Sequence, residues 1–403
     1  MNKLRKILPV VMAAAFLFTS CWDNGEEDKD PYVILVYMAA DNNLDEEVDY
    51  SLEQLGMGLA KTTGRVVVYL DREGKAPRLF ELSDGGAQIP LKDYVEENSA
   101  DAATLARVIR ETKAFIPSEK FGLIIWGHSM AWVPQGFDAR SLATTFRLGQ
   151  NIPRLRYTAL DSGSGTQQAM EIDDLADALP ASVAEFILFD VCLMGSVEAL
   201  YEIRHTCNYA IAAPTEVLAN SEYDASGMPY SKVLPYLFGD KNDLKKACEL
   251  YYTHYRDLDI SGVSFDDPRY TPEMLRSATI SLIDMKQLDG LYSVSSGILN
   301  GKLSQAAALS VSGMQKYHTD NAAQVFFDMG DVMQSLATTS QYQAFQTQLS
   351  KTVLYKAATD KFVTITIDPA HFSGLSMYVP LSAWSTYDEY NYYFNSLSWA
   401  GVY

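Results

Sequence analysis

Residues 187–200, ILFDVCLMGSVEAL, join two different sequence patterns. The first of them continue an apolar, aromatic-rich run that starts at Phe186 and is typical of a short buried strand. In residues 193–203 the apolar side chains instead recur at helical spacing. The pattern therefore predicts that a strand becomes a helix at Cys192, where a reactive side chain would be well placed.

The rest of the chain alternates between strand-like and helix-like segments. Such alternation predicts a mainly parallel α/β sheet that helices cover on both faces, built as one large unit with a C-terminal elaboration. Strand, turn and helix are expected in 31–58, strands in 64–74, 76–86, 120–129, 185–190, 209–214 and 278–284, helices in 105–115, 172–179, 244–255 and 285–299, and two strands in 361–380.

The composition is that of an ordinary globular protein. The chain has 403 residues, of which 48% are hydrophobic and 21% are charged, so it can bury one large core. Its formal net charge is −19. This charge argues against a nucleic-acid partner, because no basic face could easily dominate, and it suits cationic substrates.

The first residues read as an export signal rather than as part of the fold. A basic start at residues 3–6 precedes an apolar stretch, 7–18, that is short for a membrane-spanning helix. The sequence ending at Cys21 resembles a bacterial lipoprotein signal, in which that cysteine is lipidated; an ordinary secretory signal is the alternative. Residues 22–30 form an acidic tether. We expect an exported, membrane-anchored lipoprotein at the outer membrane or cell surface.

The remaining cysteines are Cys192, Cys207 and Cys248. An odd number cannot pair completely in an exported protein, so at least one thiol is expected to be free. We expect Cys207 and Cys248 to be buried as small apolar residues.

Two reactive side chains follow predicted strands, His128 after LIIWG and Cys192 after ILFDV. Ligands of open α/β sheets gather beyond the carboxyl ends of the strands, so imidazole and thiol would face each other if these strands are neighbours. An imidazolium and the dipole of a helix starting after Cys192 would both favour the nucleophilic thiolate. Either residue alone is more often structural. Together they make the arrangement that a cysteine peptidase needs, with structural roles for both as the alternative.

The segments FGLIIWGHSMAW (121–132) and ILFDVCLMGSVEALYE (187–202) resemble the His and Cys motifs of the clostripain family of cysteine peptidases, which has a caspase-like fold. The resemblance extends to VYMAADNNLD, AAPTEV, GMPY, ATISLIDMKQLDGL and FSGLSMYVP, and so covers essentially the whole mature chain. It implies a caspase-like three-layer αβα sandwich with a mainly parallel central sheet. Residues 31–240 would form the catalytic core and 241–403 the C-terminal elaboration packed on it.

By position, the resemblance makes Cys192 the nucleophile and His128 the general base and acid. The backbone N–H groups of Ser129 and Cys192 would form the oxyanion hole. Ser129 stands where the family usually has glycine. If the turn there requires a positive φ, a serine would distort this hole.

Family members cut after Arg or Lys, which implies an anion in the S1 pocket. Asp190 is the matching residue, with Glu216 and Asp224 as second-rank candidates; an aspartate in a turn or helix cap is the alternative for Asp190. Relatives also mature by cutting themselves between His and Cys. The candidate sites for such self-processing here are Arg140, Arg147, Arg154 and Arg156.

No cofactor is required by this chemistry, although calcium is tied to some relatives. DNNLDEEVD begins like an EF-hand, but Glu46 replaces the required glycine and Leu52 the bidentate glutamate, so this loop is rejected. The many acidic residues are compatible with an irregular calcium site, to which no residues are assigned.

The predicted function is that of a lipid-anchored cysteine endopeptidase acting on peptides or proteins with basic residues. The alternative from another class is a surface lipoprotein on the same fold that captures peptides with a decayed site, which Ser129 and MAWVP favour. An esterase or amidase using the same two residues is a third reading without a specific motif.

Overall fold

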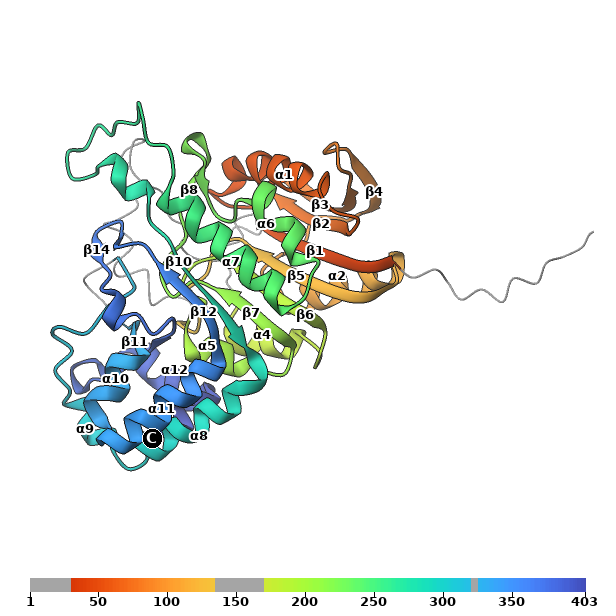
Figure 1. Ribbon diagram of the computed structural model, residues 1–403. Helices are drawn as coiled ribbons and strands as arrows, with labels where there is room; N and C mark the ends of the chain where they lie inside the picture. The colour runs from red at the N-terminus through yellow and green to blue at the C-terminus, as the bar shows by residue number, and fades with distance from the viewer. Residues whose placement is uncertain (1–29, 135–169, 320–324) are drawn as a thin grey trace, which may run out of the picture.

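The structure is a computed structural model that describes residues 30–134, 170–319 and 325–403 (Figure 1). Its centre is a nine-stranded sheet in the order β12-β10-β7-β6-β5-β1-β2-β3-β4. The strands are β1 (Asp30–Ala40), β2 (Arg65–Arg72), β3 (Lys75–Leu82), β4 (Gln88–Asp93), β5 (Ser118–Trp126), β6 (Ala184–Asp190), β7 (Cys207–Ala212), β10 (Thr279–Asp284) and β12 (Val353–Ala358).

The central strands β2, β1, β5, β6 and β7 are parallel. Their apolar runs are buried on both faces of the sheet, as parallel strands require. Antiparallel strands complete both edges, β3 and β4 on one side and β10 and β12 on the other. The predicted α/β class with a mainly parallel central sheet is confirmed.

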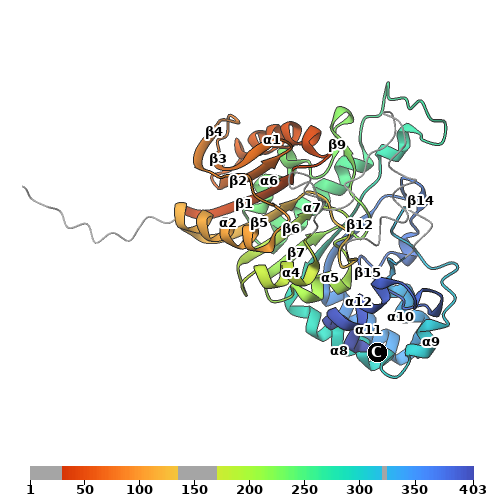
Figure 2. The ribbon, with the colours of Figure 1, turned by 180° about the vertical axis from the view of Figure 1, so that it is seen from behind.

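Helices cover both faces of the sheet and make a three-layer sandwich (Figures 1 and 2). One layer joins α1, α6 and α7, and the other joins α2, α4 and α5 with the C-terminal helices α8 and α11. The helices are α1 (Asp45–Leu59), α2 (Ala102–Phe115), α4 (Ile172–Ala178), α5 (Val197–Glu202), α6 (Tyr230–Leu237), α7 (Lys241–Arg256), α8 (Leu288–Leu299), α9 (Leu303–Ala307), α10 (Met329–Leu336), α11 (Thr339–Thr352) and α12 (Asp388–Ser396).

The C-terminal residues form shorter strands than expected. Two strands were predicted in residues 361–380, but the positive φ of Val363 (47°) and Gly374 (90°) and the ring of Pro369 interrupt the extended backbone. The segment instead makes three two-residue strands. These are β13 (Lys361–Phe362), which pairs with β14 (Ile365–Thr366), and β15 (Ser376–Met377), which pairs with β11 (Phe327–Asp328).

Some predictions fall outside the described residues. They are the lipidated Cys21, the signal before it and the tether up to residue 29, together with the four arginines between 135 and 169. Among the residues that the structure describes, no helix combines the length and the apolar character that a membrane-spanning segment requires.

Candidate active site

His128 and Cys192 follow two adjacent parallel strands, β5 and β6. Trp126 at the end of β5 is the Cα partner of Asp190 at the end of β6, and each reactive residue comes two positions later. The register therefore brings imidazole and thiol to the same edge of the sheet, as predicted. Cys192 is fully buried and His128 is 5% exposed, so the sulfur is closed to solvent in this conformation.

The segment around Cys192 is a turn, not the first turn of a helix. Helix α5 begins at Val197, five residues after the cysteine, and has six residues. The prediction that a helix dipole points toward the sulfur is therefore wrong. Two backbone hydrogen bonds hold the turn instead, from Leu193 N to Thr215 O (2.8 Å) and from Gly195 N to Ala213 O (2.8 Å).

Gly195 permits this turn to approach the chain that follows β7. A Cβ added at this position would lie 2.5 Å from the backbone nitrogen of Pro214. The same approach brings Val217 to the sulfur, because its backbone N–H donates to Cys192 Sγ at 3.1 Å. The carbonyl oxygen of Val217 lies 3.9 Å from the same sulfur, so both backbone polar groups of this residue face Cys192 Sγ.

His128 has a partner that the sequence reasoning missed. Its Nε2 lies 2.7 Å from Oδ1 of Asn43, which belongs to the turn between β1 and α1. Strand β1 pairs with β5 on the side opposite β6. The residues Asn43, His128 and Cys192 thus follow three consecutive strands of the sheet, and only this order of strands in the folded chain identifies Asn43.

Ser129, which stands in place of the family's usual glycine, has a negative φ. The left-handed residue in this turn is Ala131, with φ 54°, and its N–H donates to Ser129 Oγ at 2.9 Å. A serine therefore fits this backbone without the strain that a positive φ would cause. The predicted distortion of the oxyanion hole does not arise at this residue.

Trp132 fixes the segment that follows Ser129. The indole is fully buried, and its ring centroid lies 4.9 Å from that of Tyr378, 5.6 Å from Tyr393 and 6.4 Å from Phe326. All three partners belong to the C-terminal part of the chain. The histidine loop and the C-terminal elaboration therefore share one aromatic core.

Asp190, the first candidate for the S1 anion, is 1% exposed at the end of β6. Its Oδ2 accepts hydrogen bonds from the hydroxyl of Tyr230 (2.7 Å) and from the N–H of Met228 (3.3 Å). These donors hold the carboxylate two residues before the candidate nucleophile.

The two second-rank candidates for the S1 anion also have hydrogen-bond partners. Glu216 is fully buried, and its Oε1 accepts from both the N–H (2.7 Å) and the hydroxyl (2.6 Å) of Thr319. Asp224 is exposed and left-handed, with φ 57°, and accepts from the hydroxyl of Tyr50. Its backbone oxygen lies 2.8 Å from Nε2 of His254.

A C-terminal segment is hydrogen-bonded to the turn that contains Cys192 and to the start of α5. The N–H of Ser376, in β15, donates to Gly195 O at 2.8 Å, and the N–H of Tyr378 donates to Glu198 Oε1 at 2.7 Å. The other oxygen of Glu198 accepts from Ser196 Oγ at 2.6 Å. Burial raises the pKa of Glu198 to about 7, and these two hydrogen bonds oppose the rise.

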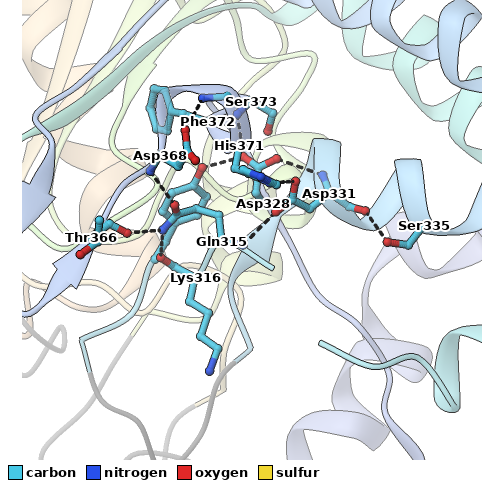
Figure 3. Close-up of polar contacts among 12 residues, drawn as sticks. Gln315, Lys316, Asp328, Asp331, Ser335, Thr366, Asp368, His371, Phe372 and Ser373 are labelled. Carbon is cyan, nitrogen blue, oxygen red and sulfur yellow. Dashed lines mark hydrogen bonds and ion pairs between the residues drawn. The ribbon is translucent and has the colours of Figure 1, made fainter. Parts of the chain in front are cut away.

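The segment just before β15 takes part in the polar network shown in Figure 3. Asp328 accepts from the hydroxyl of Tyr317 (2.6 Å) and from the N–H of Ser373 (2.6 Å), and burial raises its pKa to about 6. Asp331 lies 2.6 Å from Nδ1 of His371, and this hydrogen bond raises the pKa of the imidazole. The network therefore fixes the segment just before β15.

Within the three described ranges, no group of three or more His, Cys, Asp or Glu side chains is arranged to hold a metal ion. Cys207 and Cys248 are buried and unpaired, and burial raises the pKa of the Cys207 thiol to about 12. Neither sulfur therefore resembles a nucleophile at neutral pH.

The chain matches the model of the clostripain family over residues 36–402. It is similar to the solved structure of an inactive zymogen of a C11 protease from Parabacteroides distasonis, with 28% identity and a TM-score of 0.75 over 93% of this chain and 98% of the other. No protein of curated function matches it in sequence.

A second similar structure is that of a secreted C11 cysteine protease from Bacteroides thetaiotaomicron with an irreversible peptide inhibitor. It is 24% identical, with a TM-score of 0.73 over 93% of this chain and 99% of the other. The family match spans nearly all of the described residues, including both motifs. The chain therefore belongs to the clostripain family, the C11 cysteine peptidases.

Proposed function

We propose that this peptidase is an endopeptidase that cuts after Arg or Lys, with Cys192 as nucleophile and His128 as general base and acid. The observation that carries the proposal is the register of β5 and β6, which sets the two residues at equivalent positions beyond neighbouring strand ends. The donation from Val217 N to Cys192 Sγ supports the same assignment, because an N–H at 3.1 Å is placed to stabilise negative charge on the sulfur once the thiol has lost its proton.

In this mechanism His128 takes the proton of the Cys192 thiol, and the thiolate attacks the scissile carbonyl carbon to form a C–S bond. Breakdown of the tetrahedral intermediate breaks the C–N bond, and the imidazolium gives its proton to the leaving amine. Water then cleaves the thioester, releases the carboxylic acid and restores the thiol. The backbone N–H groups of Ser129 and Cys192 would stabilise the oxyanion in both steps.

Asp190 is the proposed partner of a basic P1 side chain. A buried carboxylate lowers the cost of burying a guanidinium or ammonium group, which would otherwise lose its hydration without a counter-charge. Asp190 is buried, and its position two residues from Cys192 suits the pocket next to the scissile bond. The other two candidates are less suited because neither is close to Cys192 in the chain, and the carboxylate of Asp224 is exposed, so it would replace less of the lost hydration of a cation.

Specificity is tested with fluorogenic peptides that carry Arg, Lys, Ala or Asp at P1. Asp190→Asn keeps an oxygen for Tyr230 and Met228 but removes the charge. We expect kcat/KM to fall about 100- to 5,000-fold for Arg and Lys, which corresponds to the roughly 3–5 kcal/mol for breaking a buried ion pair. The Ala peptide serves as the internal control and should change little. Equal loss on all peptides would mean that Asp190 is structural, and the pocket assignment would be withdrawn.

A peptide-capturing protein with a decayed site is the alternative. The negative φ of Ser129 weakens it, because the departure from glycine carries no backbone strain. The two functions differ in turnover: the binding protein would bind a basic peptide and return it intact, whereas the peptidase would release two fragments.

We also propose export with a lipid on Cys21 and anchoring at the outer membrane or cell surface, so that substrates are met outside the cell. Intact-mass measurement of the membrane fraction should show the mass of the lipid, and Cys21→Ala should release the chain.

Self-processing after an arginine between His128 and Cys192 is part of the proposal. It is supported by the closed sulfur and by the similar structure that is an inactive zymogen. The sites to be tested by cleavage mapping are Arg140, Arg147, Arg154 and Arg156.

A further inference from the structure

The turn after β1 is a rigid element at the edge of the candidate site. Asn42 builds it: its Oδ1 accepts from Leu44 N (2.9 Å), and its Nδ2 donates to Ala39 O (3.1 Å). The side chain of Leu44 is buried in the core. Asn43, between these two anchors, is exposed and presents its carboxamide to the imidazole of His128.

The same turn is also clamped from the neighbouring strand β2. The guanidinium of Arg72 donates to both carboxylate oxygens of Asp45, at 2.6 and 3.0 Å, and to its backbone oxygen at 3.3 Å. Planar two-point pairing of this kind fixes direction as well as distance. Asn43 therefore has little freedom to leave the histidine.

The contact between Asn43 and His128 defines a proton position. A carboxamide oxygen can only accept a hydrogen bond, so Oδ1 of Asn43 at 2.7 Å requires a proton on Nε2 of His128. In the neutral ring the other nitrogen, Nδ1, then carries a lone pair. In the proposed mechanism, the nitrogen that would receive the thiol proton is consequently Nδ1.

We propose that Asn43 is a positioning residue that holds neutral His128 in the Nε2-protonated form and directs Nδ1 to the reaction. The proposal rests on the proposed roles of His128 and Cys192. It adds a third residue to the site. Asn43, His128 and Cys192 follow the adjacent strands β1, β5 and β6, so Asn43 would act on His128 and His128 on Cys192. The amide also stabilises the imidazolium formed during the reaction, because its oxygen still accepts from Nε2–H.

The direct test is the tautomer of His128, measured by nitrogen-15 NMR in the full chain with Cys192→Ala at a pH where the ring is neutral. The chain has five histidines, and His128→Gln identifies the resonance. We expect Nε2 to carry the proton, and we expect Asn43→Ala to produce a mixture of both forms. A ring protonated on Nδ1 in the chain with Asn43, or a tautomer unaffected by Asn43→Ala, would overturn the proposal.

Kinetics separate positioning from folding. Asn43→Ala should lower kcat about 10- to 100-fold, as for groups that orient a functional histidine in metal sites, with little change in KM. Asn43→Asp keeps the accepting oxygen, so it should restore most of kcat and move the His128-dependent limb of the pH profile to higher pH. Asn391→Ala, the same substitution at an exposed position of α12, should leave all values unchanged.

These measurements distinguish the failure of this inference from failure of the proposed function. If Cys192→Ala retained full hydrolysis, the proposed nucleophile would be wrong, whereas the tautomer of His128 would still report whether Asn43 fixes the ring. If Cys192→Ala abolished hydrolysis but Asn43→Ala kept kcat and the tautomer, only the role of Asn43 would be withdrawn.

Discussion

Glu198 makes the stability of this protein depend on pH near neutrality. Its carboxyl group is fully buried in the first turn of α5, where it accepts hydrogen bonds from Ser196 and Tyr378. Burial raises its pKa from 4.5 to about 7. The folded protein therefore binds a proton that the unfolded chain has already released between these two pH values.

The sign and size of the effect follow from this difference. The folded state is favoured fully below pH 4.5, and that contribution is lost as pH rises through about 7. A pKa moved from 4.5 to about 7 corresponds to a loss of about 3 kcal/mol at 1.36 kcal/mol per pH unit. Glu198→Gln cannot titrate, and its amide can still accept from Tyr378 N and pair with Ser196 Oγ.

The assay is urea-induced unfolding of the Cys192→Ala chain with and without Glu198→Gln, from about pH 5 to about pH 8. We expect the chain with Glu198 to lose about 2.5 kcal/mol relative to the Glu198→Gln variant over this range, because part of the full effect is already lost at pH 5. Asp328, whose pKa is raised to about 6, adds the same fall to both proteins and cancels in the difference. A difference in unfolding free energy that stays constant with pH would refute the reasoning.

Two further predictions concern the frame of the site. Gly195→Ala should lower the free energy of unfolding by about 1–3 kcal/mol and also lower kcat, because its Cβ would meet the backbone of Pro214. Gly297→Ala, which has open space around it in α8, should raise the free energy of unfolding by about 0.5–1 kcal/mol. Glu216→Ala should cost about 1–3 kcal/mol because both donors of Thr319 lose their acceptor, whereas Glu216→Gln should retain most of that stability. Thermal unfolding measures all four, and equal effects within either pair would contradict the account.

The parallel centre of the sheet could be predicted because its signal is local. Strands β1, β5 and β6 are apolar runs long enough to be recognised without their neighbours. The edge strands β4 and β12 have six residues each and show no alternation of buried and exposed side chains, so their pairing rather than their sequence defines them. The strands that are buried on both faces could therefore be predicted from the sequence, whereas the two outermost strands of the sheet could not.

The residues of the candidate site also fall into those that the sequence could predict and those that it could not. His128 and Cys192 could be found because each follows a recognisable strand at the end where ligands gather. Asn43 could not, because its role depends on β1 lying beside β5, which the sequence order does not fix. Glu216 is a candidate for the S1 anion from the sequence because Thr319, which engages it in the fold, lies 103 positions later in the chain.

The central claim is that Cys192 is a nucleophile activated by His128 in a site for basic side chains. Its most direct test is mass spectrometry of the full chain after incubation with peptidyl chloromethyl ketones that differ only at P1. The account predicts one adduct, on Cys192, formed faster with Arg or Lys than with Ala and lost in His128→Ala. Adducts on Cys207 or Cys248 instead, or a Cys192 adduct that forms equally fast without His128 and with any P1 residue, would contradict it.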